Sequence, residues 1–91
     1  GLVLTKVELV EGNLIYTCKD TKLTKDEYDY SAETKESVKT SMKNFLKASF
    51  GQEEFKDLVD TKVNIKYDFF DKNEEPIYDV TITVSDMKEM L

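Results

Sequence analysis

The groups of this sequence that could do chemistry are nineteen acidic side chains, thirteen lysines and one cysteine, Cys18. Histidine is absent, so the ordinary general base near neutral pH and the imidazole metal ligand are both missing. The spacing of the acidic residues selects no pair for acid–base catalysis, and most of them are expected on polar faces, where the pKa of a carboxyl group is not strongly raised. Cys18 has no histidine to activate it. The sequence therefore predicts no catalytic residue and a protein that is not an enzyme.

Two acidic segments have the composition of a cation site. Residues 71–75 place oxygen ligands at alternate positions, but Pro76 stands where a calcium loop of the EF-hand type needs glycine, and Ile82 stands where the bidentate glutamate belongs. The acidic residues of segment 26–33 precede and enter a predicted helix, where they complement the positive charge of its N-terminus. We therefore predict no metal site, and no cofactor.

The charged residues of the sequence indicate which classes of partner are expected. The net charge is −6, and every basic residue is lysine, so the planar fork with which arginine binds phosphate is missing. An acidic chain of this kind is a poor match for a phosphate backbone, and no nucleic-acid partner is expected. No apolar run approaches the ~18 residues of a membrane-spanning helix, so no transmembrane segment is expected.

The first predicted element is a hairpin over residues 3–19. Gly12 and Asn13 form a two-residue turn signal, because both tolerate a positive φ. With this pair at the turn centre, Val7 lies opposite Cys18, and both point to the inner face. Cys18 is therefore predicted to be a small, buried and unreactive side chain. The inner face as a whole consists of Val7, Leu9, Leu14, Tyr16 and Cys18.

The second hairpin, over residues 62–85, has the clearest alternation of apolar and polar residues in the chain. A four-residue loop at residues 72–75 sets the register, and Pro76 lies at the loop edge, where a missing N–H costs little. All eight paired apolar residues then share one face. The predicted pairs are Phe69 with Tyr78, Tyr67 with Val80, Ile65 with Ile82 and Val63 with Val84.

A long amphipathic helix is predicted between the hairpins, from Ala32 to Ser49, with Ser31 as its N-cap. Its apolar residues recur at helical spacing in one narrow stripe. A second, shorter helix is predicted from Glu53 to Val59.

These elements predict a single α+β domain over residues 1–91. Two antiparallel hairpins form one four-stranded sheet, in the order β-β-α-β-β, and the central helix covers one face of the sheet. The other face, which carries alternating polar residues, meets water. The sequence leaves the order of the strands in the sheet open.

Six side chains are candidates for an interaction surface. Tyr28 and Tyr30 lie in a polar loop and Phe70 faces away from the inner face, so each either packs at the edge of the core or contributes to recognition. The C-terminal segment resembles the start of a helix, with Asp86 as its cap and Glu89 three residues later. Its apolar residues are Met87, Met90 and Leu91. This segment either frays or joins a sheet edge in binding a protein partner or a second copy of the chain.

The function expected from the missing chemistry is that of a non-enzymatic interaction or accessory domain. The alternative is a small-ligand carrier or an enzyme subunit with a pocket between helix and sheet, lined by the hydroxyls of Tyr16, Tyr67 and Tyr78. The start at Gly1 without Met resembles a processed or trimmed end. The order of hairpin, helix and hairpin is shared by many small exported bacterial domains, so a bacterial, exported or cell-envelope protein, such as a lipoprotein, is expected in preference to a cytoplasmic one.

Overall fold

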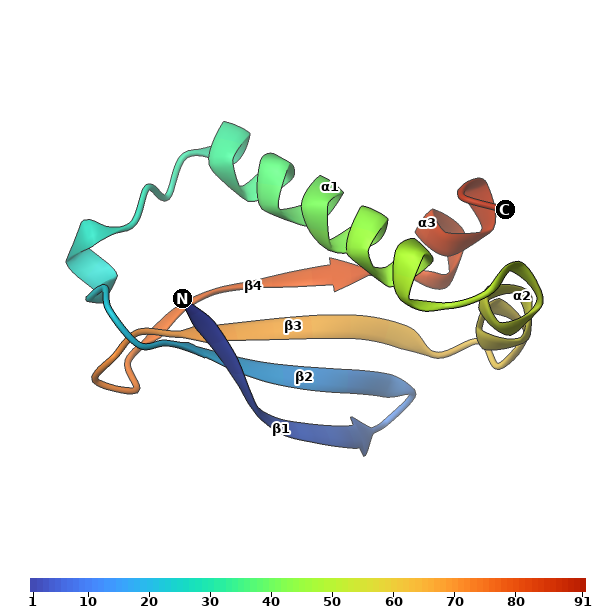
Figure 1. Cartoon of the computed structure of the whole chain (residues 1–91), viewed down its shortest axis with the longest axis horizontal. Helices are drawn as coiled ribbons and strands as arrows, with labels where there is room; N and C mark the ends of the chain where they lie inside the picture. The colour runs from blue at the N-terminus through green and yellow to red at the C-terminus, as the bar shows by residue number, and fades with distance from the viewer.

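The computed structural model describes residues 1–91 and has an α+β fold built on one four-stranded sheet (Figure 1). Two consecutive helices separate the hairpins, so the predicted order β-β-α-β-β is corrected to β-β-α-α-β-β. A further short helix ends the chain. The elements are β1 (Leu2–Val10), β2 (Asn13–Asp20), the 3-10 turn η1 (Lys25–Glu27), α1 (Ala32–Ser49), α2 (Gln52–Asp60), β3 (Asn64–Phe70), β4 (Pro76–Ile82) and α3 (Val84–Glu89).

The strands lie in the order β1-β2-β3-β4, and the sheet is mixed. Each hairpin is antiparallel, as predicted, but β2 and β3 run parallel, with Asn13 beside Asn64 and Lys19 beside Phe70. The expectation of an entirely antiparallel sheet is therefore wrong. The reason is the return path, because α1 and α2 carry the chain back to the end of the sheet at which β2 begins. A crossover of this length is what parallel neighbours require.

The turn of the first hairpin is centred one residue earlier than predicted. Glu11 and Gly12 both have a positive φ, of 48° and 80°, as a turn between two twisted strands needs. Val10 therefore pairs with Asn13, and Val7 lies opposite Tyr16 rather than Cys18. The alternation along each strand is unchanged by this shift, so the predicted inner-face residues still share a face.

The second hairpin follows its prediction closely. The predicted pairs of Ile65 with Ile82, Tyr67 with Val80 and Phe69 with Tyr78 are confirmed. The outermost pair is not formed, because β3 begins after Val63 and Val84 already belongs to α3. These inward side chains are the centre of the core, and Ile65 and Ile82 are fully buried.

Helix α1 has the predicted bounds, and the Ser31 hydroxyl accepts a hydrogen bond of 3.2 Å from the amide of Thr34. Leu46 is its only fully buried residue, because the apolar stripe is too narrow to bury more of the helix. A helix is about 10–12 Å across and strands are about 4.8 Å apart, so one helix covers about two strands. Figure 1 shows α1 on the β4 side of the sheet, with β1 at the far edge. The predicted cover over the whole inner face is therefore only half present.

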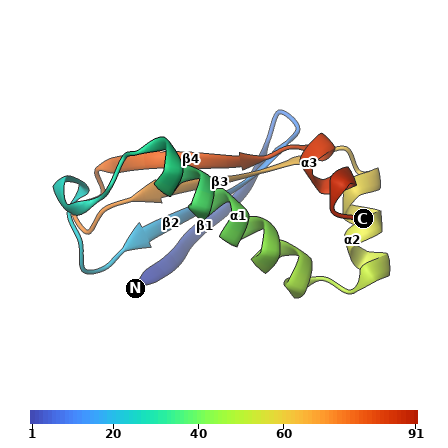
Figure 2. The ribbon, with the colours of Figure 1, turned by 90° about the horizontal axis from the view of Figure 1, so that it is seen from above.

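The C-terminal segment forms α3, which packs beside α2 at one end of the molecule (Figure 2). Its N-cap is Thr83, not Asp86. The two residues form a reciprocal capping box, in which Asp86 occupies the third helical position. Met87 is 0% exposed and completes the core. None of the three α-helices combines the length and the apolar composition needed to cross a bilayer.

Candidate functional site

Exposed apolar side chains are concentrated on β1, an edge strand of the sheet. Of the ten large hydrophobic residues that are exposed, six lie on this edge strand, and Leu9 is 66% exposed. On the side of the sheet that faces α1, the exposed residues of β1 are Leu2, Leu4, Val7 and Leu9. The last three pair with residues of β2 that pack against the core, and Leu2 lies with residues of α1 around one hollow. We call this face of β1 and β2, with the facing side of α1, the open half of the sheet.

A groove runs between α1 and the first hairpin in the open half. It encloses about 470 Å³, and eleven of its twelve lining residues are hydrophobic. Tyr16 and Cys18 of β2 form part of its floor, Leu4 lies on the β1 side, and Met42 and Phe45 lie on the α1 side. Phe45 is 64% exposed, although its neighbour Leu46 is buried in the core. The groove can hold apolar side chains or an aliphatic chain, and it offers few groups that would bind a polar ligand.

A second hollow of about 480 Å³ continues along α1 towards its N-terminus. It shares Leu2, Met42 and Phe69 with the groove, but it also contains Tyr28 and Glu33 and is therefore more polar. The seam between α1 and the sheet is thus incompletely filled along much of the helix. Polar contacts at one end and apolar contacts along the rest would suit an amphipathic partner.

The Cys18 thiol lies in the floor of the groove and is only half-buried, so its predicted full burial is corrected. Partial burial, followed by the nearby Asp68 carboxylate, raises the pKa of the thiol. The thiolate is therefore scarce near neutral pH, which suits a packing side chain rather than a nucleophile. Burial likewise raises the pKa of the neighbouring Tyr67 to about 12, so its hydroxyl stays protonated.

Asp20 and Tyr28 join the end of β2 to the loop before α1. The Tyr28 hydroxyl donates a hydrogen bond to the Asp20 carboxylate, which also accepts from the amides of Lys22 and Leu23. The bond from Tyr28 and the two amides lower the pKa of Asp20 to about 2. Burial, followed by the bond to Asp20, raises the pKa of Tyr28. Both groups keep their ordinary protonation states near neutral pH, so the pair holds the loop in place and is not suited to proton transfer.

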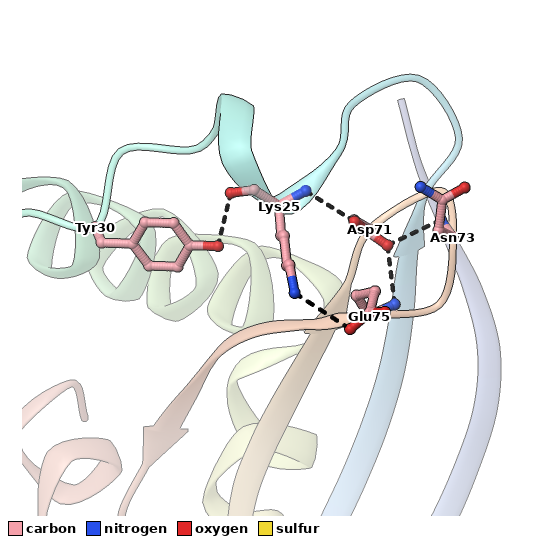
Figure 3. Close-up of polar contacts among 5 residues, drawn as sticks. All are labelled: Lys25, Tyr30, Asp71, Asn73 and Glu75. Atoms are coloured by element: carbon pink, nitrogen blue, oxygen red, sulfur yellow. Dashed lines mark hydrogen bonds and ion pairs between the residues drawn. The ribbon is translucent and has the colours of Figure 1, made fainter.

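The acidic loop after β3 is organised around Asp71, which is 1% exposed (Figure 3). One carboxylate oxygen accepts from the amides of Asn73 and Glu75, and the other accepts from the amide of Lys25, each at 2.8 Å. Burial acts to raise the pKa of Asp71, but these three amides outweigh it and lower the pKa. The carboxylate therefore binds the loop backbone, and no group of three or more potential metal ligands is present.

The structure brings two of the predicted interaction residues together. Tyr28 and Tyr30 both lie edge-on to Tyr78, with ring centroids 6.3 and 6.1 Å from it. The Tyr30 hydroxyl donates to the carbonyl oxygen of Lys25 at 2.8 Å. Phe70 is separate from them, because it lies half-buried on the face of the sheet away from α1. Tyr28 thus packs at the edge of the core and lines the polar hollow, whereas Tyr30 contacts Tyr78 but stays 43% exposed.

The three C-terminal candidates have different environments. Met87 is buried in the core, so it contributes nothing to a surface and its inclusion in one is corrected. Met90 packs partly against the core, and its carbonyl oxygen accepts a hydrogen bond of 2.7 Å from Lys47. Leu91 is 62% exposed. The segment is a packed helix with one exposed apolar residue at its end.

The sequence-based choice of surface residues missed β1 and Phe45. A signal for them was present, because four strands need about two covering helices and the chain has only one long one. The alternation in β1 predicts core residues only if the helix covers the whole face. No family model, curated protein or solved structure matches this chain, so its function has to be inferred from its own residues.

Proposed function

We propose that this chain is a non-enzymatic interaction domain that binds a protein through the open half of its sheet. The observation that carries the proposal is the concentration of exposed apolar side chains on β1, an edge strand, beside a groove with an almost wholly hydrophobic lining. Contiguous apolar surface of this kind is characteristic of binding sites, and a free strand edge is a template for pairing.

The distribution of charge supports binding over catalysis. The five carboxylates with lowered pKa values all accept hydrogen bonds from backbone amides; they are Asp20, Glu27, Asp29, Asp71 and Asp86. Those bonds cap or close local segments, as in the capping box of α3. None of these five carboxylates is among the residues that line the apolar groove. The groove thus offers contact area, with no acid–base pair to act on a bound molecule.

A carrier of a small apolar ligand is the second candidate, because the helix–sheet seam is not filled. The groove has room for an aliphatic chain, and Tyr16 and Tyr67, which stack with centroids 5.2 Å apart, lie in its lining. Cys18 reports on this alternative directly. A fatty acid such as laurate, bound in the groove, would slow the labelling of Cys18 by iodoacetamide, and unchanged labelling at saturating laurate would exclude the carrier.

Site-specific photo-crosslinking tests the proposed function. A photoreactive phenylalanine analogue is placed at Phe45 in the open half, and the matched control carries it at Asp79, which is exposed on the opposite face. In cells that express the chain, position 45 should give a discrete protein adduct and position 79 should not. The proposal fails if position 45 gives no adduct, or if both positions give the same mixture.

A further inference from the structure

The outer edge of β1 has a defined set of free backbone groups. Val10 and Asn13 flank the two-residue turn and form a hydrogen-bonded pair, so Glu8 and Lys6 also bond to β2, while Val7 and Leu9 direct their N–H and C=O groups outwards. The bond from the amide of Thr21 to the carbonyl of Gly1 agrees with the same alternation beyond the bulge. The edge therefore has donors and acceptors available at every second residue.

The bulge in β1 preserves the two faces of the strand. Thr5 and Lys6 together oppose Thr17, so they occupy a single position of the ladder. On either side of the bulge, Leu4 and Val7 point towards α1. Val3, Lys6, Glu8 and Val10 lie on the opposite face, and Lys6 and Glu8 form an ion pair of 3.3 Å there. The edge thus carries an apolar row on one face and a mixed row on the other.

We propose that the protein bound by the open half is a second copy of this chain, paired antiparallel through β1 with a two-fold axis at Val7. This inference rests on the proposed function and names its partner. In this register, Lys6 of each copy lies opposite Glu8 of the other. Since the bulge counts as one position, Leu9 then lies opposite Leu4 of the second copy, and Val10 lies opposite Val3. Each of these pairs is apolar with apolar or positive with negative, on matching faces, and the mismatch of Leu2 with Glu11 of the turn falls at the end of the strand.

The other symmetric registers lack this complementarity. An axis at Leu9 sets Glu8 opposite Val10 and Val7 opposite Glu11, so charged groups meet apolar ones. An axis at Glu8 or Lys6 sets like charges against each other, which is unfavourable. The outer edge of β4 is a poorer partner, because Pro76 lacks an N–H and cannot donate to a paired strand. Charge complementarity therefore selects β1 and the register at Val7.

Pairing in this register would make one continuous sheet from two copies. The two open halves then lie next to each other, because the two-fold axis is perpendicular to the sheet and both α1 helices are on the same side. Val7 of one copy contacts Val7 of the other at the centre of the apolar floor. Exposed apolar side chains on both faces of β1 gain neighbours at once, which accounts for the presence of apolar residues in the mixed row as well as in the apolar row.

Disulfide trapping tests the register. In an antiparallel hydrogen-bonded pair the Cα atoms are about 5.5 Å apart, which suits a disulfide. In a Cys18→Ala background, Val7→Cys should form a covalent dimer rapidly under mild oxidation. The matched variant is Leu9→Cys, which is more exposed but lies away from its symmetry mate, and it should cross-link slowly. Equal rates for the two variants, or no cross-linking of Val7→Cys, would overturn the proposal.

A charge swap tests the same register without a covalent bond. By symmetry, Lys6→Glu or Glu8→Lys creates two like-charge contacts, and each should weaken dimerisation by about tenfold in sedimentation velocity. The double swap should restore affinity to within about threefold. Lys66→Glu is the matched control, because Lys66 and Asp68 form a similar pair of 3.6 Å on the inner strand β3. It should leave dimerisation unchanged, and an equal loss for Lys66→Glu and Lys6→Glu would contradict the proposal.

The two proposals can fail separately. If the chain stays monomeric at high micromolar concentration while Phe45 cross-links to a different protein, self-pairing is wrong and the interaction function holds. If the chain is monomeric and position 45 gives no adduct, both are wrong. An adduct at twice the mass of the chain, together with rapid trapping of Val7→Cys, supports both.

Discussion

The Asp71 carboxylate accepts a hydrogen bond of 2.8 Å from the backbone amide of Lys25, which lies 46 residues earlier in the chain. This bond joins the loop after β3 to the 3-10 turn that precedes α1 (Figure 3). It is reinforced by an ion pair of 3.4 Å between Lys25 and Glu75. One end of the molecule is thus held together by a buried carboxylate, whereas the edge strand β1 is left open.

Asp71→Asn should therefore destabilise the protein. The amide side chain has one carbonyl oxygen, so it cannot accept all three backbone N–H bonds, and its NH₂ group would face a backbone donor. We expect the Tm to fall by several degrees in thermal unfolding at neutral pH. Asp57→Asn, an exposed change on α2, is the control and should have little effect. Equal melting of the two variants would show that the loop does not depend on Asp71.

The Asp20–Tyr28 pair predicts a specific acid sensitivity. The pKa of Asp20 falls from its ordinary 3.8 to about 2 on folding, so the unfolded chain binds the proton first as the pH drops. The stability that Asp20 contributes is complete above about pH 5 and is lost as the pH falls through 3.8 towards 2. Tyr28→Phe removes the main cause of the shift and should flatten this part of the unfolding profile.

Tyr30→Phe is the matched control for that experiment. The hydroxyl of Tyr30 donates to the Lys25 carbonyl, which does not titrate, so the acid profile should keep its wild-type shape. If Tyr28→Phe and Tyr30→Phe change the slope of the unfolding profile between about pH 4 and about pH 2 to the same extent, this acid sensitivity does not come from Asp20.

Met87→Ala should unfold far more easily than wild type. The side chain is fully buried between α3 and the core, and removing it leaves a cavity that costs about 2–5 kcal/mol. Leu91→Ala, at the exposed end of the same segment, should change the free energy of unfolding by less than about 0.5 kcal/mol. Urea denaturation measures both values. A small loss for Met87→Ala would mean that the C-terminal segment frays in solution.

Leu46 and Phe45 are neighbours on α1, but Leu46 lies in the core and Phe45 lies in the open half. Leu46→Ala should cost about 2–5 kcal/mol, because Leu46 is buried. Phe45→Gln should change stability by less than about 0.5 kcal/mol, since the ring is largely exposed and glutamine is a good helix former. The same Phe45 variant should weaken partner binding. A large loss of stability from Phe45→Gln would place the ring in the core and remove it from the proposed surface.

The sequence predicts local structure here better than it predicts assembly. The capped helix α1 and three of the four pairs in the second hairpin follow from spacing and turn chemistry alone. The parallel contact between β2 and β3 does not, because alternation within a hairpin says nothing about its neighbour. The apolar stripe of α1 does not by itself show that the helix covers only half of the inner face of the sheet. That conclusion requires a comparison of the width of one helix with the width of four strands.

The candidate surface residues also show that sequence patterns predict local structure better than packing. Tyr28 and Tyr30 are unusual for a polar loop, and the sequence leaves packing and recognition open for both; in the structure each ring lies edge-on to Tyr78. The exposed residues of β1 have the alternation of a core strand, and only the position of α1 shows that part of this row is uncovered. Met87 shows the converse, because three-dimensional packing gives a core position to a residue that the strand pattern leaves out.

The most direct test of pairing between the β1 strands of two copies is amide hydrogen exchange, measured for each residue of β1 at high and at low protein concentration. The outward amides of Val7 and Leu9 should be protected at high micromolar concentration and should exchange rapidly on dilution. The amide of Glu8 bonds to β2 in either state, so its protection should not change. Equally rapid exchange of Val7 and Leu9 at both concentrations would contradict pairing through β1.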